Sequence, residues 1–420
     1  MSEQLVADRG SLGGRRFVVI PGGKLDAGQS AFRRGTGRLQ LGVSTYAAIC
    51  WIVGGAAVFG LVMVTSATAV PGGGSMWSGG LRQAAWVALG GCAYLVGSRL
   101  DYRRLRRLIR PAYLASLAAL VAARLPHLGV YSYGSVRWLK IGPLHVQPSE
   151  LAKLTVALFM ADLITRRWFQ LANWRRVLLP SLLSLGLVSA LVLAQPDLGT
   201  AVIICAMVLC MLFVAGVPLR QLGLGGAVVV AGGLVAAFGS SYRRARLLAF
   251  LHPWAHPLGS GYQVVESLSG LAQGGLFGVG LGASPLKWGL LPNASTDFIF
   301  AVIGNELGLL GALAVVGLFV TFAVWGVRAA RMAPDRFGAL LAAGIVSWIC
   351  MEALVNMGAA LGLLPVTGIP LPFISAGGSS TVVEMAGAGL LASVARLGEA
   401  ARPSQRRGSA SAGMRLGSSA

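Results

Sequence analysis

Ten long apolar stretches recur along this 420-residue chain, and they restrict its fold more than any other feature. A helix needs about 20 residues to cross a bilayer, and most of the stretches are close to that length. They lie at residues 45–64, 83–99, 111–129, 150–165, 177–194, 199–217, 222–239, 297–327, 338–360 and 380–395. Only 12% of the residues are charged, whereas soluble globular domains carry about a quarter. The sequence therefore predicts an all-α, polytopic membrane protein with about ten transmembrane helices.

Polar segments flank this apolar region at both ends. Residues 1–44 are rich in Gly and Arg and lack helical periodicity, and residues 397–420 have a similar composition. Because a 44-residue polar segment precedes the first span, we do not expect that span to be a cleaved signal peptide. The predicted organisation is a disordered basic tail (1–44), a transmembrane domain (45–396) and a second disordered tail (397–420).

The positive charge follows the connections between the spans. The formal net charge is +21, and 26 of the 35 Lys and Arg residues fall in the terminal tails and every second connection. This is the positive-inside pattern, and it places both termini in the cytoplasm. Clusters that flank membrane spans, without interleaved aromatic residues, argue against nucleic-acid binding. We expect those at 99–110 and 166–176 to contact anionic lipid.

The acidic residues are distributed differently. Eight of the fourteen lie within predicted spans or in outer connections, where ionisable groups usually mark functional or paired sites. They are Glu150, Asp162, Asp197, Glu266, Asp297, Glu306, Glu352 and Glu384. Three long connections also lie on the outer side, at 128–149, 361–379 and, between the seventh and eighth spans, 240–296. Long connections tend to be functional, so we expect an ordered cap there, with a helix near 262–273 along the interface.

Asp297 lies where the outer loop meets the eighth span. One interpretation is an N-cap, because Asp accepts hydrogen bonds from first-turn N–H groups. The other is a partly desolvated general base beside an apolar run.

Two further acidic positions also leave alternatives open. Glu150 and Lys153 are three residues apart and share a helix face, so they form either a self-neutralising buried pair or groups that orient substrate. Asp197, in an outer turn, either caps the next helix or joins the polar cluster.

The third outer connection contains three prolines, which forbid a continuous helix. Gly377, Gly378, Ser379 and Ser380 then precede a helix start. Free N–H groups there favour an anion such as a diphosphate, and a structural re-entrant turn is the alternative.

These segments together resemble the FtsW/RodA/SpoVE (SEDS) family. The resemblance runs from about Gly60 to Arg396 and includes the segments 60–67, 136–139, 147–153, 197–200, 242–246, 274–282, 296–300 and 364–380. It implies ten helices and peptidoglycan glycosyltransferase activity on lipid II at the bacterial cytoplasmic membrane. It also implies partnership with a class B penicillin-binding protein and other division or elongation proteins. The segment 373–375 is more similar to the division branch.

The resemblance also implies roles for individual residues. Asp297 matches the essential outer-loop carboxylate, and Glu150, Lys153 and Asp197 match the conserved intramembrane polar set. We expect Asp297 to deprotonate the acceptor sugar's 4-hydroxyl, with Arg137, Lys153, Arg243 and Arg246 stabilising the departing diphosphate. A lipid II flippase and a non-catalytic division scaffold are the competing hypotheses.

The chain departs from the family pattern at five positions. Asn293, Ser295 and Asn305 replace a Glu, a His and a Glu, and His252 and His256 replace two Asp residues. These changes remove negative charge near Asp297, so they weaken the case for a divalent cation (Mg²⁺ or Mn²⁺) held by carboxylates. Pro253 and Pro257 also break the helix that would align the two histidines on a metal.

Overall fold

The computed structural model describes residues 43–69, 78–125, 128–132, 135–142, 144–239, 244, 250–259 and 261–416. Each of the ten predicted spans overlaps a helix. These helices are α2 (Thr45–Thr68), α3 (Ser78–Arg99), α4 (Ile109–Ala122), α5 (Pro148–Arg166), α6 (Leu178–Leu193), α7 (Leu198–Ala215), α8 (Leu219–Phe238), α11 (Ile299–Met332), α12 (Arg336–Ala360) and α13 (Ser379–Leu416). The helix expected near 262–273 is α10 (Tyr262–Gly274).

Six of these helices are long and apolar enough to cross a membrane by length and composition: α2, α7, α8, α11, α12 and the first part of α13. The helices α4 and α6 are also apolar but shorter. The third span was expected to reach residue 129, but α4 ends at Ala122 and a strand begins at Gly129. Helix α13 continues to Leu416, past the predicted boundary at Arg396. Residues 1–42 of the first predicted tail lie outside the described residues.

The fold is helical as predicted, with one small sheet among the described residues that the sequence did not indicate. In the connection 128–149, strands β1 (Gly129–Ser132), β2 (Ser135–Ile141) and β3 (Leu144–Val146) form an antiparallel meander in the order β1-β2-β3. Leu139 pairs with Gly129 on one side and with Val146 on the other. The strands are three to seven residues long, and this is too short for an alternation of apolar and polar residues to mark them in the sequence.

Local signals set several helix boundaries. Asp197 and Asp335 are the N-caps of α7 and α12, and their side chains accept from the backbone N–H groups of Thr200 and Gly338. Pro148 occupies the first turn of α5, where its missing N–H costs nothing.

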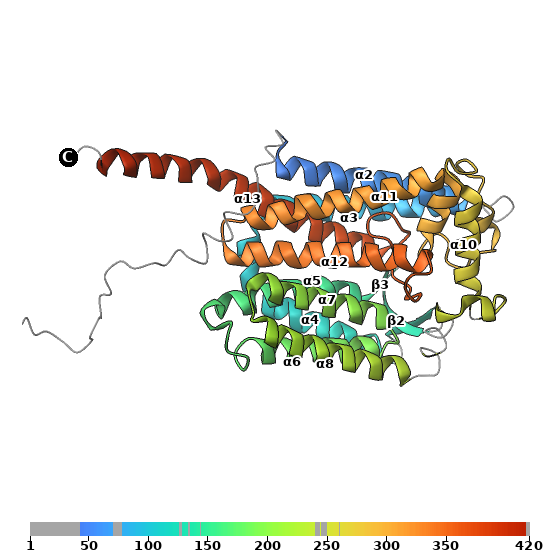
Figure 1. Ribbon diagram of the computed structural model, residues 1–420, viewed down its shortest axis with the longest axis horizontal. Coiled ribbons are helices and arrows are strands. Elements are labelled where there is room, and N and C mark those ends of the chain that lie inside the picture. The colour runs from blue at the N-terminus through green and yellow to red at the C-terminus, as the bar shows by residue number, and fades with distance from the viewer. Residues whose placement is uncertain are drawn as a thin grey trace, which may run out of the picture. The chain divides into compact units, whose positions relative to one another are not determined.

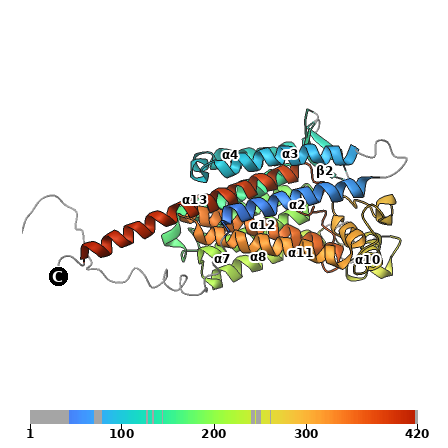
Figure 2. The ribbon, with the colours of Figure 1, turned by 90° about the horizontal axis from the view of Figure 1, so that it is seen from above.

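The spanning helices lie roughly side by side in a bundle, and α10 lies across one end of it (Figures 1 and 2). Helix α13 packs along α3 and also contacts α2, α11 and α12. A Cβ atom at Gly389 of α13 would lie 2.4 Å from the carbonyl oxygen of Tyr94 in α3, so only glycine allows this close approach. The strands β2 and β3 lie at the same end as α10 (Figure 1).

Helix α11 is broken near that end. Gly308 has φ 68° and ψ −165°, outside the helical region. The interrupted hydrogen bonding is replaced by the segment after α10: the N–H groups of Val279 and Gly280 donate to the carbonyls of Asn305 and Glu306. The break is therefore stabilised by backbone hydrogen bonds that join α11 to the connection 240–296.

The opposite end of the bundle is basic. The 3₁₀ helix η1 (Tyr102–Arg107) lies beside the start of α12, where Arg103 forms a 2.8 Å ion pair with Asp335. Burial disfavours the charge of Asp335, but hydrogen bonds from Tyr102, Gly338 and Arg103 outweigh it and hold the pKa of Asp335 below its usual value. Asp162 near the end of α5 binds both Arg106 and Arg166.

Candidate active site

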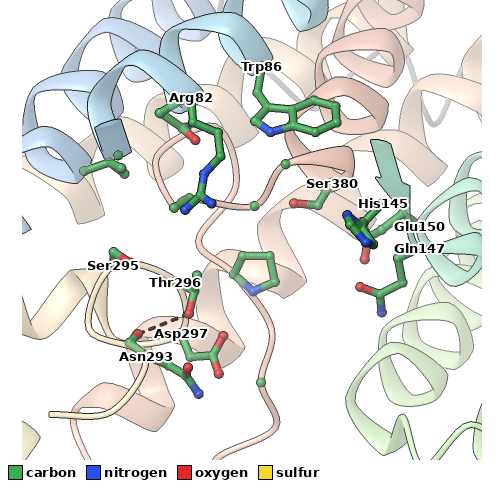
Figure 3. Close-up of a pocket in the computed structure, with 18 of the residues that line it drawn as sticks. Arg82, Trp86, His145, Gln147, Glu150, Asn293, Ser295, Thr296, Asp297 and Ser380 are labelled. Atoms are coloured by element: carbon green, nitrogen blue, oxygen red, sulfur yellow. Dashed lines mark hydrogen bonds between the residues drawn. The ribbon is translucent and has the colours of Figure 1, made fainter. Parts of the chain in front are cut away.

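A cavity of about 460 Å³ opens at the end of the bundle where the three long connections meet (Figure 3). Its wall combines residues from α2, α3, β2, β3, α5, the turn before α11, the connection 361–379 and the start of α13. The residues that line it are Val64, Thr68, Gly79, Arg82, Gln83, Trp86, Arg137, Trp138, His145, Gln147, Glu150, Asn293, Ser295, Thr296, Asp297, Gly368, Pro370, Ala376, Gly377, Gly378 and Ser380.

Asp297 places a half-buried carboxylate on this wall. It belongs to a turn before α11, in which its N–H donates to the carbonyl of Asn293 over 3.0 Å. The N-cap position of α11 falls on Phe298, so the alternative prediction that Asp297 is the N-cap is wrong. In Figure 3 the carboxylate extends from the turn toward the connection 361–379, whose Gly368 lies beside it. Asp297 is therefore placed to exchange a proton with a molecule in the cavity.

Three basic side chains line the cavity on other elements. Arg82 comes from α3, Arg137 from β2 and His145 from β3. Among the described residues, the buried Nε of Arg137 has no hydrogen-bond partner. A buried donor without a partner is costly, so a ligand oxygen here would relieve a penalty that the folded chain carries.

The start of α13 also meets the cavity. Gly377, Gly378 and Ser380 line it, while the hydroxyl of Ser379 accepts from the N–H of Gln147 over 3.2 Å. A Cβ at Gly377 would lie 2.0 Å from the Oγ of Ser380, so a larger residue here would force that hydroxyl to move. The helix N-terminus adds positive potential to the cavity, which Arg82 and Arg137 also line.

Asp197 both caps α7 and joins a polar cluster, so the two alternatives raised for it hold together. One oxygen accepts from the N–H of Thr200 over 3.0 Å. The other accepts from the hydroxyl of Thr200, the amide of Gln147 and the hydroxyl of Ser149. Asp197 is not on the cavity wall, but it fixes Gln147, which is.

Lys153 is the cation of a buried cluster of charged side chains that lies behind the cavity wall. Its ammonium lies 2.7 Å from Glu150, which confirms that the two side chains meet, and it also binds Glu352 of α12. Lys153 is only 1% exposed and does not line the cavity. Glu384 of α13, also fully buried, accepts the N–H of Phe373 over 2.9 Å. Of the predicted intramembrane pair, only Glu150 reaches the cavity.

The remaining predicted residues have different positions. Arg243 and Arg246 lie outside the described residues. His252 and His256 are exposed on either side of the 3₁₀ helix η3 (Pro253–Ala255) and do not line the cavity. Asn305 is buried and donates to the carbonyl of Gly270, which ties α11 to α10. Asn293 and Ser295 do line the cavity.

The cavity also contains residues that the sequence analysis did not select, namely Arg82, Trp86 and His145. Arg82 could have been selected from the sequence, because it is a cation in a segment that the positive-inside pattern places on the outer side. Trp86 and His145 carried none. In the part of the chain that the structure describes, no three His, Cys, Asp or Glu side chains are grouped so that they could hold a metal ion.

Comparisons with known proteins agree with this architecture. The sequence profile of the FtsW/RodA/SpoVE family, described as a cell cycle protein, matches residues 47–399. A probable peptidoglycan glycosyltransferase FtsW of Geobacter metallireducens is 38% identical over 340 residues, which cover 80% of this chain and 90% of the relative. Stage V sporulation protein E of Bacillus subtilis is 35% identical over 346 residues, with coverages of 80% and 93%.

A solved structure shares the fold. A chain of a peptidoglycan synthase complex, in which polymerization and crosslinking are coordinated, superposes with a TM-score of 0.70 at 30% identity. The match covers 83% of this chain and 97% of that one. The helical architecture, the six apolar helices and the match over residues 47–399 all show that this chain is a multi-pass membrane protein of the FtsW/RodA/SpoVE family.

Proposed function

We propose that this protein is a peptidoglycan glycosyltransferase that polymerises lipid II in the cavity around Asp297. The observation that carries the proposal is the lining of the cavity, which combines the carboxylate of Asp297 on the turn before α11 with cationic side chains from α3 and the sheet. Glycosyl transfer from a lipid diphosphate needs a base for the acceptor and positive charge for the leaving group. The names of the relatives support the same chemistry.

In this mechanism Asp297 accepts the proton of the acceptor sugar's 4-hydroxyl. The hydroxyl oxygen then forms a bond to the anomeric carbon of the donor, with inversion, and the bond from that carbon to the diphosphate oxygen breaks. The electron pair leaves with undecaprenyl diphosphate. Arg137, Arg82 and His145, together with the start of α13, are the groups of the cavity wall suited to that negative charge.

The contributions of these groups differ in size. A positioned general base supplies roughly 10²–10⁴-fold. Orientation of the two substrates and stabilisation of the leaving group must supply the rest. Lys153 contributes indirectly in this scheme, because its ammonium holds Glu150 and Glu352 rather than a ligand.

The position of the cavity supports chemistry on the outer face of the bacterial cytoplasmic membrane. Helix α5 starts at the cavity, with Glu150, and ends at Arg166 in the basic end of the bundle. Because basic residues favour the cytoplasmic side, the cavity end would face outward and both termini would be cytoplasmic. The likeness to a chain of a synthase complex supports a transpeptidase partner, which we propose is a class B penicillin-binding protein.

A reconstituted reaction tests the proposal. Purified protein in detergent, supplied with lipid II and no other enzyme, should convert it into glycan strands resolved by gel electrophoresis. A flippase would instead translocate labelled lipid II across liposomes without forming polymer. Translocation without polymer, or neither activity, would contradict the proposal.

A further inference from the structure

The turn that carries Asp297 is held through three consecutive backbone carbonyls. The carbonyl of Ser295 accepts from the N–H of Ala376 over 3.0 Å, and that of Thr296 accepts from the hydroxyl of Ser375 over 2.6 Å. The carbonyl of Asp297 itself accepts from the side-chain amide of Asn356 over 2.8 Å. All three contacts are made to backbone carbonyls, so they hold the turn through its main chain and do not involve the carboxylate of Asp297.

Both donating side chains are buried and engaged a second time. Ser375 is 1% exposed, and its Oγ also accepts the N–H of Leu371 over 2.8 Å. Asn356 is 2% exposed, and its amide also donates to the carbonyl of Ile369 over 2.8 Å. Each side chain therefore joins the turn of Asp297 to the connection 361–379, which forms another part of the cavity wall.

The connection is itself anchored at other points. The amide of Gln83 in α3 donates to the carbonyl of Ser375 over 3.2 Å. Phe373 adopts φ 64°, a left-handed conformation that is unfavourable for a large side chain, and its N–H is held by the buried Glu384. A backbone held in this way at a cavity wall gives Ser375 a fixed position from which to hold Thr296.

We propose that Ser375 and Asn356 are positioning residues for Asp297. This inference rests on the proposed function, because it assigns them the task of holding the general base within reach of the acceptor hydroxyl. They do not touch substrate, since neither lines the cavity. Without these two side chains the turn would lose its hydrogen bonds to them and the carboxylate of Asp297 would shift, whereas the cations Arg82 and Arg137 would keep their positions.

The test compares Ser375→Ala with Ser393→Ala in the purified full-length protein. Ser393 is the control: it is a fully buried serine in α13, and its hydroxyl donates to the carbonyl of Leu100 far from the cavity. Ser375→Ala loses two buried hydrogen bonds and Ser393→Ala loses one, so both variants should show a lower Tm. Only Ser375→Ala should lose kcat, by roughly 10–100-fold with KM for lipid II little changed, because a shift of about 1 Å can cost 10²-fold.

Asn356→Ala also removes two hydrogen bonds, one of them to the carbonyl of Asp297 itself, and should lower kcat at least as much. Should it fail to fold, the Ser375 and Ser393 pair decides alone. The inference is overturned if Ser375→Ala keeps kcat within about twofold of Ser393→Ala, because displacement of a catalytic group should cost far more than that. Asp297→Asn in the same assay distinguishes a failure of the proposed general base from a failure of the positioning role. If it polymerises at the parent rate, the proposed base is wrong; if it is inactive while Ser375→Ala keeps its rate, only the positioning role falls.

Discussion

Lys153 is a single ammonium surrounded by carboxylates in a dry part of the bundle. It binds Glu150 and Glu352, and Glu384 also lies within electrostatic range. Burying charges is costly unless they are paired, so the cluster depends on its one cation more than on any one carboxylate. The cluster therefore differs from an isolated ion pair, in which one cation faces one carboxylate.

We therefore expect Lys153→Met to destabilise the protein more than Glu150→Gln. Removing the lysine strands several acids, at a cost of about 3–5 kcal/mol, whereas removing Glu150 leaves the ammonium paired with Glu352. The double variant should be less destabilised than the sum of the two single variants. Thermal unfolding in detergent measures all three, with Lys287→Met, outside the spanning helices, as the control. Additive effects would mean that the two side chains are not coupled.

The sequence was informative about some of these residues and silent about others. The spacing of Glu150 and Lys153 was enough to place them on one helix face. The partners Glu352 and Glu384 come from helices about 200 residues later, and no local pattern reports such a contact. Ser375 and Asn356 were missed for the same reason, because their role depends on where the turn of Asp297 folds back.

At the scale of elements, hydrophobic length located the spanning helices well. It could not locate the break in α11, because the predicted span 297–327 runs through Gly308 and Gly is common in membrane helices. Nor could it locate the sheet in 128–149, whose strands are three to seven residues long. The break depends on pairing with the segment after α10, and the strands are too short for a periodic pattern to mark them.

Gly308 gives a prediction at this scale. A Cβ there would lie 2.4 Å from the N of Gly278, and the residue has φ 68°. Gly308→Ala should lower stability by about 2–3 kcal/mol and reduce polymerisation, since the break joins α11 to the outer connection. Gly317→Ala, later in the same helix with open space around it, is the control and should be neutral or stabilising by up to about 1 kcal/mol. Equal effects of the two substitutions on Tm would show that the break is not required.

At the scale of the whole molecule, the cavity and the basic clusters occupy opposite ends of the bundle. The account needs the cavity end to face outward, where a lipid-linked acceptor and donor would meet a growing strand. Charge supports this orientation, because the connections near Arg106 and Arg166 are far more basic than those around the cavity.

Cysteine labelling tests the orientation directly. Ala283 is exposed near the cavity end, and Ala172 is exposed in the connection between α5 and α6 at the basic end. In a background with Cys50, Cys92, Cys205, Cys210 and Cys350 replaced, Ala283→Cys should react with a membrane-impermeant maleimide in intact spheroplasts. Ala172→Cys should react only after lysis. The reverse pattern would place the cavity in the cytoplasm.

The central claim is that Asp297 acts as the general base of glycan polymerisation, and Asp297→Asn tests it most directly. The amide keeps the size of the side chain but cannot accept the acceptor proton, so the rate of glycan formation should fall by roughly 10²–10⁴-fold. The measurement is the initial rate with purified lipid II, at matched protein concentration and with Tm within a few degrees of the parent. A folded Asp297→Asn variant that polymerises at the parent rate would contradict the account.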